Sequence, residues 1–341
     1  MSEYTTELRE LVGSVVPDDG STPTPGRARE VWARLRELGL PRIGTPEDCG
    51  GSGGTLDDLL VVVQALAARG VGVPVVEASV ADWVIGHVRP LDDALATVAL
   101  ENPSRAVSVD TDGRIMGELR AVPWARDATL LVVAGQGRET MLVDLRHESV
   151  TVEEGENLAG EPRDTVLLDG APATPVASGP GYEAVRSRLA LLWSAAVTGA
   201  AHGAYRLTKA YVSGRRQFDA PLLRLPAVSS GLALMRVQLV QADAALALAR
   251  DAVATAGAGD AAVASARVTT ARTASEAARL AHQLHGAMGV TQEYPLHHFT
   301  RRLWAWRDAV AAEHEWAGEL GTVAAESGED AVWTRLTATG R

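Results

Sequence analysis

The sequence has almost no cysteine and few aromatic residues. Cys49 is the single cysteine among 341 residues, which excludes an intrachain disulfide framework and a zinc site built from cysteines. Only 4% of the residues are aromatic although 46% are hydrophobic, so the apolar content is mostly alanine, valine and leucine. Residues of this kind suit close packing of helices. A chain of this length is expected to form two or three domains with a sizeable core.

An excess of basic charge is lacking as well. The formal net charge of -11 argues against a nucleic-acid-binding surface and against a basic membrane-binding face, although local arginine clusters can still hold phosphate. The first 20 residues lack the basic and then apolar pattern of a signal peptide, and we expect no stretch of membrane-spanning length. The histidines lack metal-ligand spacing, so no metal site is expected. We therefore expect a cytoplasmic protein with neither nucleic-acid binding nor membrane insertion.

Residues 1–95 are expected to form an N-terminal helical domain. Residues 27–38 have helical character, and Thr55 with Asp58 three residues later is a capping-box pattern that opens a helix reaching Gly70. The glycine-rich stretch 41–54 between them lacks the lysine and hydroxyl ending of a phosphate-binding P-loop. It is therefore interpreted as a loop.

Residues 96–178 are expected to form a middle β domain. Short runs rich in β-branched residues alternate with glycine-containing turns at nearly regular spacing, which predicts a small antiparallel sandwich or barrel. The runs are 97–100, 106–109, 130–133, 141–144, 149–152 and 165–168. The proline-rich stretch 171–181 is interpreted as the linker that leaves this domain.

Residues 179–341 are expected to form a C-terminal four-helix bundle. One apolar stripe, with alternating spacings of four and three, is typical of a bundle core. Its members are Val228, Leu232, Met235, Leu239, Ala242 and Leu246. Gly199 and Gly203 lie one above the other and allow a neighbouring helix to approach closely. Residues 281–308 combine a helix end, a glycine turn and a new arginine-rich helix opened by Pro295, which is either a simple helix connection or a ligand site.

Three segments resemble motifs of the acyl-CoA dehydrogenase family, and together they span nearly the whole chain. Residues 215–222 (RRQFDAPL) resemble the family's Arg-x-Gln-Phe-Gly-x-Pro loop, and residues 283–296 (QLHGAMGVTQEYPL) resemble its Gln-x-x-Gly-Gly-x-Gly segment with the following Glu-Tyr-Pro. Residues 46–54 (PEDCGGSGG) are similar to the family's N-terminal Pro-Glu-x-x-Gly-Gly-x-Gly. The order of helical segment, β module and bundle is also that of the family.

The resemblance implies an FAD cofactor and an acyl-CoA thioester substrate. It implies that Arg215 pairs with the pyrophosphate, that Phe218 packs on the cofactor, and that Gln283, Gly286 and Ala287 contact the diphosphate region. In the family, a carboxylate removes the α-proton of the thioester while the β-hydrogen leaves as hydride to the flavin. An electron-transfer acceptor is then implied as a further partner.

The chain departs from the family at the catalytic base. The positions that match the family's two alternative base sites hold Val310 and Leu189, and neither side chain can accept a proton. On a continuing helix, Asp308 would lie about 200° around the axis from Val310 and Glu313 about 4.5 Å further along, so both are weak candidates for the base. Ion pairing of Asp308 with a neighbouring arginine and a solvated face for Glu313 are favoured. The β module also lacks the family's Trp-x-Thr strand and has residues 121–127 (AVPWARD) near that place.

These departures are similar to those of the short, base-lacking subunits of heteromeric actinobacterial members of the family. The run 300–308 resembles those subunits. The resemblance implies a hetero-oligomer in which a longer partner supplies the carboxylate, acting on a sterol side-chain or other specialised acyl-CoA thioester. Two alternatives stay open: a homo-oligomeric enzyme with altered flavin chemistry, as a monooxygenase or with Asp308 or Glu313 as base, and a non-enzymatic helical scaffold.

Overall fold

The structure is a computed structural model that describes residues 4–16, 25–102, 107–177, 179–217, 219–256 and 260–337. The backbone divides into two compact units. Unit 1 comprises Met1–Thr5, Arg29–Leu59 and Val73–Leu189, and unit 2 comprises Thr6–Ala28, Leu60–Gly72 and Ala190–Arg341. Each unit is therefore built from more than one stretch of the chain. The division into three domains at residues 95 and 178 stays a prediction.

The N-terminal region is helical, as predicted. Its elements are α1 (Thr5–Val15), α2 (Pro25–Glu37), η1 (Leu40–Arg42), η2 (Glu47–Cys49), α3 (Leu56–Ala67) and α4 (Val75–Ile85). The predicted capping box forms: the Thr55 N–H donates to Asp58 Oδ2 at 2.8 Å and the Asp58 N–H donates to Thr55 Oγ1 at 3.2 Å. Two helices were not predicted. α1 lies in a polar stretch without a clear pattern, and α4 is buried almost throughout, so it lacks the polar face that identifies a surface helix.

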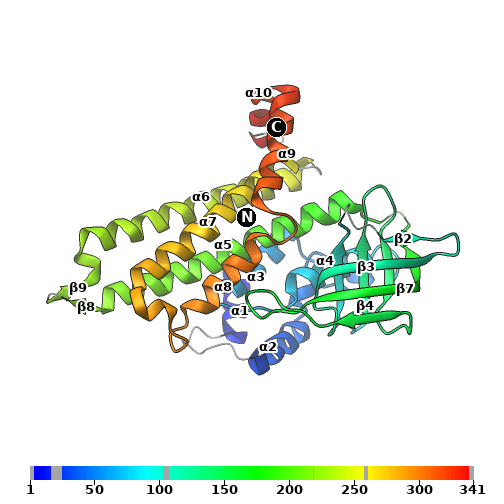
Figure 1. Ribbon diagram of the computed structural model, residues 1–341, viewed down its shortest axis with the longest axis horizontal. Helices are drawn as coiled ribbons and strands as arrows, with labels where there is room; N and C mark the ends of the chain where they lie inside the picture. The colour runs from blue at the N-terminus through cyan, green and yellow to red at the C-terminus, as the bar shows by residue number, and fades with distance from the viewer. Residues whose placement is uncertain are drawn as a thin grey trace. The chain divides into compact units, whose positions relative to one another are not determined.

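Unit 1 also contains the β module. Its strands are β1 (Ala96–Leu100), β2 (Ser108–Val109), β3 (Arg114–Pro123), β4 (Leu130–Ala134), β5 (Met141–Asp144), β6 (Val150–Glu153) and β7 (Arg163–Pro175). They form one sheet in the order β1-β4-β5-β7-β3-β2, with β6 also paired to β7 (Figure 1). β1 and β4 pair in parallel, whereas the other pairs of this sheet are antiparallel. Fully buried side chains of Ile115, Leu131, Val143 and Val166 lie in its core.

Two features of the β module differ from the sequence predictions. β3 was not predicted, because Gly117 and register shifts beside Ile115 and Leu119 interrupt its alternation. The predicted linker 171–181 begins as strand, since β7 continues to Pro175 and pairs there with β5. Backbone pairing on both edges thus overrides the turn-forming composition of this stretch.

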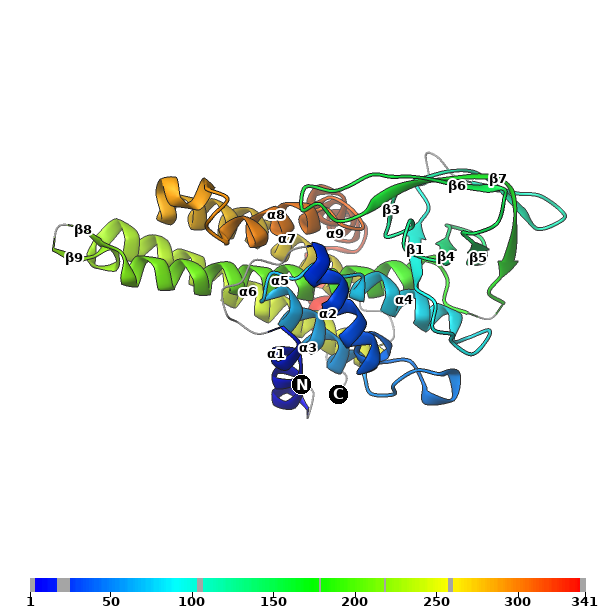
Figure 2. The same cartoon turned by 90° about the horizontal axis from the view of Figure 1, so that it is seen from below.

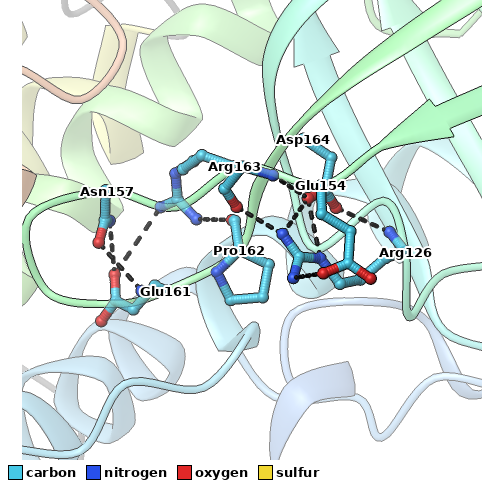
Figure 3. A network of polar contacts seen from close by, with 8 residues as sticks. Arg126, Glu154, Asn157, Glu161, Pro162, Arg163 and Asp164 are labelled. Carbon is cyan, nitrogen blue, oxygen red and sulfur yellow. Dashed lines mark hydrogen bonds and ion pairs between the residues drawn. The ribbon is translucent and has the colours of Figure 1, made fainter.

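A buried carboxylate ties the long connection before β7 to the turn after β3 (Figure 3). Asp164 is fully buried and accepts hydrogen bonds from Arg126 Nε at 2.9 Å and from the Gly155 N–H at 3.1 Å. Arg126 Nη1 also pairs with Glu154 at 2.9 Å. Nη2 of the preceding residue, Arg163, lies 3.1 Å from Oε1 of the buried Glu77 on α4. Charged groups therefore fix this corner of unit 1.

Unit 2 contains the helical bundle. Its elements include most of α5 (Tyr182–Gly214), whose residues up to Leu189 belong to unit 1. The others are β8 (Arg216–Gln217), β9 (Ala220–Pro221), η4 (Leu222–Arg224), α6 (Pro226–Ala256), α7 (Asp260–His285), η5 (Gly286–Val290), α8 (Leu296–Arg307), α9 (Glu313–Ser327) and α10 (Glu329–Thr337). Helices α6 and α7 lie side by side (Figure 2). The last of the four expected helices is divided into α8, α9 and α10. Arg267 Nη2 donates hydrogen bonds to the carbonyl oxygens of Arg307 and Ala309, where the chain leaves α8.

The packing of the bundle follows the sequence pattern. Leu232, Met235, Leu239, Ala242 and Leu246 of α6 are buried, as the apolar stripe predicts. A β-carbon at Gly199 would lie 2.3 Å from the Gln64 carbonyl oxygen, and one at Gly203 would lie 2.2 Å from the Phe299 ring. The two glycines therefore permit the close approach that was predicted from their spacing.

The expectation about membrane-spanning length was wrong for one helix. Within the described residues, Pro226–Ala254 of α6 is long and apolar enough to cross a membrane by length and composition alone. A core helix of a bundle meets the same criterion, so this carries little weight by itself. Only 28% of the tested stretch is buried, however, and α6 therefore has apolar surface beyond its core stripe.

Candidate cofactor site

The glycine turn after α7 is the centre of the candidate site. α7 ends at His285, and η5 follows directly. Gly286 has a φ of +58°, which favours glycine, and no atom lies within 4 Å of a β-carbon built on it. Gly289 is buried, and a β-carbon there would lie 2.8 Å from Cβ of His285. Gly286 thus forms the turn beside open space, and Gly289 allows the turn to pack against His285 at the end of α7.

The three residues predicted to contact a diphosphate lie at this turn. Gln283, Gly286 and Ala287 are all exposed. Gln283 Oε1 accepts a hydrogen bond from Arg279 Nη1 at 3.2 Å, and Arg279 also pairs with Glu276 at 2.8 Å. This bond engages the oxygen of the Gln283 side chain and directs its NH2 group away from Arg279.

Arg215 lies in the connection between α5 and α6. Its N–H donates to the Tyr211 carbonyl at 2.8 Å, and its carbonyl accepts from the Leu222 N–H at 2.8 Å, which closes the β8–β9 hairpin. Asp219 at the tip has a φ of +60°. Arg215 is exposed. Phe218, the other residue predicted to contact the cofactor from this loop, lies outside the described residues.

An aromatic cluster connects the two loops. The Tyr211 ring stacks on the His285 ring with centroids 4.5 Å apart, and the Tyr294 ring lies 5.6 Å from Tyr211 and 4.9 Å from His285. Arg215 is one helical turn past Tyr211, and Gly286 directly follows His285. The hairpin and the glycine turn accordingly lie at the same end of the bundle (Figure 1). This cluster was not predicted, because Tyr211 is 74 residues from His285 and 83 residues from Tyr294 in the sequence.

Burial disfavours a charged imidazole at this turn. Burial lowers the pKa of His285 below its ordinary value, and the nearby His282 lowers it further, against the opposing effect of the hydrogen bond from His285 to the Ala281 carbonyl. The donors of the site are therefore the backbone N–H groups of an exposed glycine turn, an amide NH2 group and the Arg215 guanidinium. This set fits the diphosphate portion of FAD, because glycine lets backbone donors approach phosphate oxygens and arginine supplies a fixed cation.

The two positions expected for a catalytic base, 310 and 189, hold apolar side chains. Position 310 does not lie on a continuing helix, as the prediction assumed. α8 ends at Arg307, and Val310 lies in the loop that follows, with a φ of +78°. The helical offsets predicted for Asp308 and Glu313 were therefore wrong, because they assumed a continuing helix. Leu189 is buried in α5.

Both weak candidates for the base are engaged in ion pairs. Asp308 pairs with Arg307 Nη2 at 2.6 Å, as the sequence favoured, and Glu313 pairs with Arg272 Nε at 2.7 Å. Glu313 is the first residue of α9 and not a member of α8. Each carboxylate thus already has a cationic neighbour within its own unit.

The β module of unit 1 has an unusual turn where the family's Trp-x-Thr strand was sought. Ala121 and Trp124 have φ values of +54° and +55°, and the Trp124 N–H donates to the Pro162 carbonyl at 3.2 Å. The residues described here include no group of three or more histidine, cysteine, aspartate or glutamate side chains that could hold a metal ion.

Comparisons with known proteins agree with the motif resemblance. Residues 184–307 match the family model of the acyl-CoA dehydrogenase C-terminal domain, and residues 7–88 match that of the N-terminal domain. The chain is 28% identical over 307 residues to acyl-CoA dehydrogenase IpdE2 of Mycobacterium tuberculosis, covering 86% of this chain and 89% of that protein.

Solved structures with the same fold include complexes of two different chains. The ChsE4-ChsE5 complex from Mycobacterium tuberculosis is similar with a TM-score of 0.83 and 21% identity, over 96% of this chain and 98% of that chain. A variant of the Tcur3481-Tcur3483 steroid ACAD is similar with a TM-score of 0.85 and 25% identity, over 95% and 98% of the two chains.

Proposed function

Because the chain belongs to the acyl-CoA dehydrogenase family, we propose that it is an FAD-binding subunit of a heteromeric acyl-CoA dehydrogenase whose partner supplies the catalytic carboxylate. The observation that carries this proposal is the Tyr211–His285 stack, which brings the Arg215 loop and the Gly286 turn to one end of the bundle. Both loops were matched to cofactor motifs independently of each other.

In this proposal, the residues at the end of the bundle hold the diphosphate of FAD. The Arg215 guanidinium pairs with phosphate oxygens, while Gln283 and the backbone of Gly286 and Ala287 donate hydrogen bonds to them. His285 supports the turn through its stack with Tyr211. FAD, when bound, accepts the β-hydrogen of the acyl thioester as hydride.

The need for a partner rests on the side chains at the two base positions. Val310 and Leu189 cannot take the α-proton, and Asp308 and Glu313 are paired with arginines. A carboxylate from a longer partner subunit of the same family fills this gap. The two-chain complexes among the similar structures support this arrangement, and the word steroid in one of their titles supports a sterol side-chain or comparably specialised acyl-CoA substrate. We place the assembly in the cytoplasm, where a separate electron acceptor reoxidises the flavin.

The partner requirement is tested by purifying the chain alone and together with a longer acyl-CoA dehydrogenase-like chain from the same organism. FAD content and acyl-CoA-dependent reduction of an artificial electron acceptor are measured for each preparation. We expect activity from the pair and none from the single chain. Full activity of the single chain would overturn the partner requirement, and absence of FAD from both preparations would overturn the flavoprotein assignment.

The diphosphate role is tested in the active preparation with Arg215→Met and Gln283→Ala. Loss of a charged or direct hydrogen bond to phosphate is expected to raise the FAD dissociation constant about tenfold or more for Arg215→Met and less for Gln283→Ala. Arg224→Met is the matched control, because Arg224 is an exposed arginine of the same connection. Equal FAD affinity of the Arg215 and Arg224 variants would refute the assignment.

A further inference from the structure

Unit 1 contains a cavity of about 360 Å³. It is bounded by α2, η1, α4 and the segment 93–96 that leads into β1. Arg215, Gln283, Leu189 and Val310 are not among its lining residues. The volume is within the range of small-molecule sites in proteins, and at roughly 30 Å³ for each water-sized group it holds up to about twelve non-hydrogen atoms.

The lining of this cavity is largely apolar. Trp32 and Leu95 line it and are half-buried. Ala78 and Ala96 are buried, and their short side chains leave the space between the elements open. An apolar ring suits such a lining, because it can pack on the indole of Trp32 while its surface is removed from water.

One buried carboxylate interrupts the apolar lining. Asp82 of α4 is only 8% exposed, and its Oδ2 lies 3.6 Å from Arg42 Nε, which is longer than a hydrogen bond. Burial raises the pKa of Asp82 to about 6, although Arg42 lowers it, so the group is a carboxylate at pH 8. A carboxylate has about four lone-pair sites. Asp82 therefore keeps the capacity to accept a hydrogen bond from a molecule in the cavity.

Two arginines of the lining bind the backbone just before β1. Arg36 Nη2 donates to the carbonyl oxygen of Asp93, and Arg42 Nη2 donates to that of Asp92. These bonds tie the segment before β1 to α2 and η1. One wall of the cavity is thus fixed by charged hydrogen bonds, which suits a preformed site.

The charges of the lining disfavour an ionised ligand. Arg42 lies beside Asp82 and repels an ammonium group at this place, whereas Asp82 itself repels a carboxylate. A neutral hydroxyl group avoids both, because it donates to the carboxylate without bringing a further charge out of water.

We propose that this cavity binds a neutral ring compound with a hydroxyl group, whose ring packs on Trp32 and whose hydroxyl donates a hydrogen bond to Asp82. The site goes beyond the proposed function, since it requires neither FAD nor a partner chain. A ligand of this class stabilises the arrangement of α2, α4 and β1, because it binds the folded unit and not the unfolded chain.

The ligand class is tested by calorimetric titration of the full-length chain at pH 8 with four probes of similar size. We expect 2-naphthol to bind about tenfold or more tightly than 2-fluoronaphthalene, which has the same ring system and no hydrogen to donate. The cation of 2-naphthylmethylamine and the anion 2-naphthoate are expected to bind more weakly than 2-naphthol. The proposal is overturned if 2-naphthol does not bind saturably, if 2-fluoronaphthalene binds equally well, or if either ion binds more tightly.

The position of the site is tested with three variants. Asp82→Asn keeps the shape of the side chain and is expected to weaken 2-naphthol binding about tenfold while leaving 2-fluoronaphthalene binding unchanged, because a neutral acceptor replaces a charged one. Ala33 lines the cavity and is exposed, so Ala33→Trp is expected to obstruct it and to abolish binding of both probes without altering the core. The matched control is Arg34→Trp, since Arg34 is exposed on α2 and is not a lining residue.

Thermal unfolding without ligand confirms that each variant is folded, and a folded Ala33→Trp variant that binds 2-naphthol like the Arg34→Trp control would place the ligand elsewhere and refute the site. An equal loss of both probes in Asp82→Asn would refute the hydrogen bond to Asp82.

Discussion

The guanidinium of Arg267 is fully buried and donates from Nη2 to the carbonyl oxygen of Arg307 at 2.7 Å, at the point where α8 ends. The same nitrogen lies 3.2 Å from the Trp306 carbonyl and 3.0 Å from that of Ala309. Burial lowers the pKa of Arg267 to about 10, and nearby Asp308 opposes this shift, so the group remains protonated at neutral pH. The carbonyl end of a helix carries partial negative charge and is the natural site for a cation.

Replacing Arg267 by glutamine is expected to destabilise the protein by about 2–4 kcal/mol, because buried carbonyl oxygens lose a charged donor. The free energy of unfolding is measured by denaturant titration. The control is Arg272→Gln, which removes the exposed pair with Glu313 and is expected to change stability by less than about 1 kcal/mol. Equal effects of the two substitutions would contradict a capping role for Arg267.

Val310 holds a left-handed backbone conformation, which is costly for a β-branched residue. We expect Val310→Gly to be more stable than Val310→Ala by about 1 kcal/mol, since glycine adopts this conformation without the strain of a β-carbon. Ala309→Gly serves as the control and is expected to destabilise, because residue 309 has no positive φ. Thermal unfolding of the three variants gives the comparison, and a lower stability of Val310→Gly than of Val310→Ala would disprove the strain.

Glu77 is expected to make stability depend on pH. Burial raises its pKa to about 7, although Arg163 lowers it. The native state therefore binds a proton that the unfolded chain has lost between about pH 4.5 and 7, so the free energy of unfolding falls as pH rises through this window and levels off above it. The loss is on the order of 3 kcal/mol.

The pH dependence is checked by unfolding at a series of pH values for the wild type and for Glu77→Gln. The free energy of unfolding of Glu77→Gln is expected to fall less between about pH 4.5 and 7 than that of the wild type, because the glutamine side chain does not titrate. Asp82→Asn is a useful comparison, since burial raises the pKa of Asp82 to about 6 beside Arg42 and its effect is expected at lower pH. Identical pH profiles of wild type and Glu77→Gln would rule out the contribution of Glu77.

Removing the carboxylate of Asp164 is expected to cost about 3–5 kcal/mol, because the Arg126 guanidinium and the Gly155 N–H would lose a buried acceptor. Asp164→Ala is compared with Glu118→Ala, which removes a half-buried partner of the exposed Arg120 and is expected to cost about 1 kcal/mol or less. Chemical denaturation measures both. A small effect of Asp164→Ala would mean that the network in Figure 3 contributes little to the β module.

Much of the fold could be predicted from local sequence pattern. The Thr55 capping box, the runs that became β4, β5 and β6, and the core stripe of α6 all depend on residues close together in the chain. α4 could not be predicted in this way, because it is buried on all sides and has no alternation to detect. β3 is hidden by its irregular register with β7.

The candidate site was predictable in part. Motif spacing identified Arg215, Gln283, Gly286 and Ala287, and the structure brings their two loops to one end of the bundle. Their contact with a cofactor stays a prediction, and Phe218 lies outside the described residues. The Tyr211–His285 stack that joins the loops was not predictable, since stacking depends on the distance between two helices and leaves no periodic signal in the sequence.

The sequence by itself determined the family, the order of helical and β segments, and the absence of a carboxylate at positions 189 and 310, because these follow from residue identity and local spacing. Only the tertiary structure decided where α8 ends. A buried arginine from α7, about 40 residues earlier in the chain, donates to the carbonyl oxygens of Trp306, Arg307 and Ala309, and the backbone has a positive φ at Val310. The helix therefore ends where a distant charge meets its carbonyl groups, and helix propensity alone cannot locate that point.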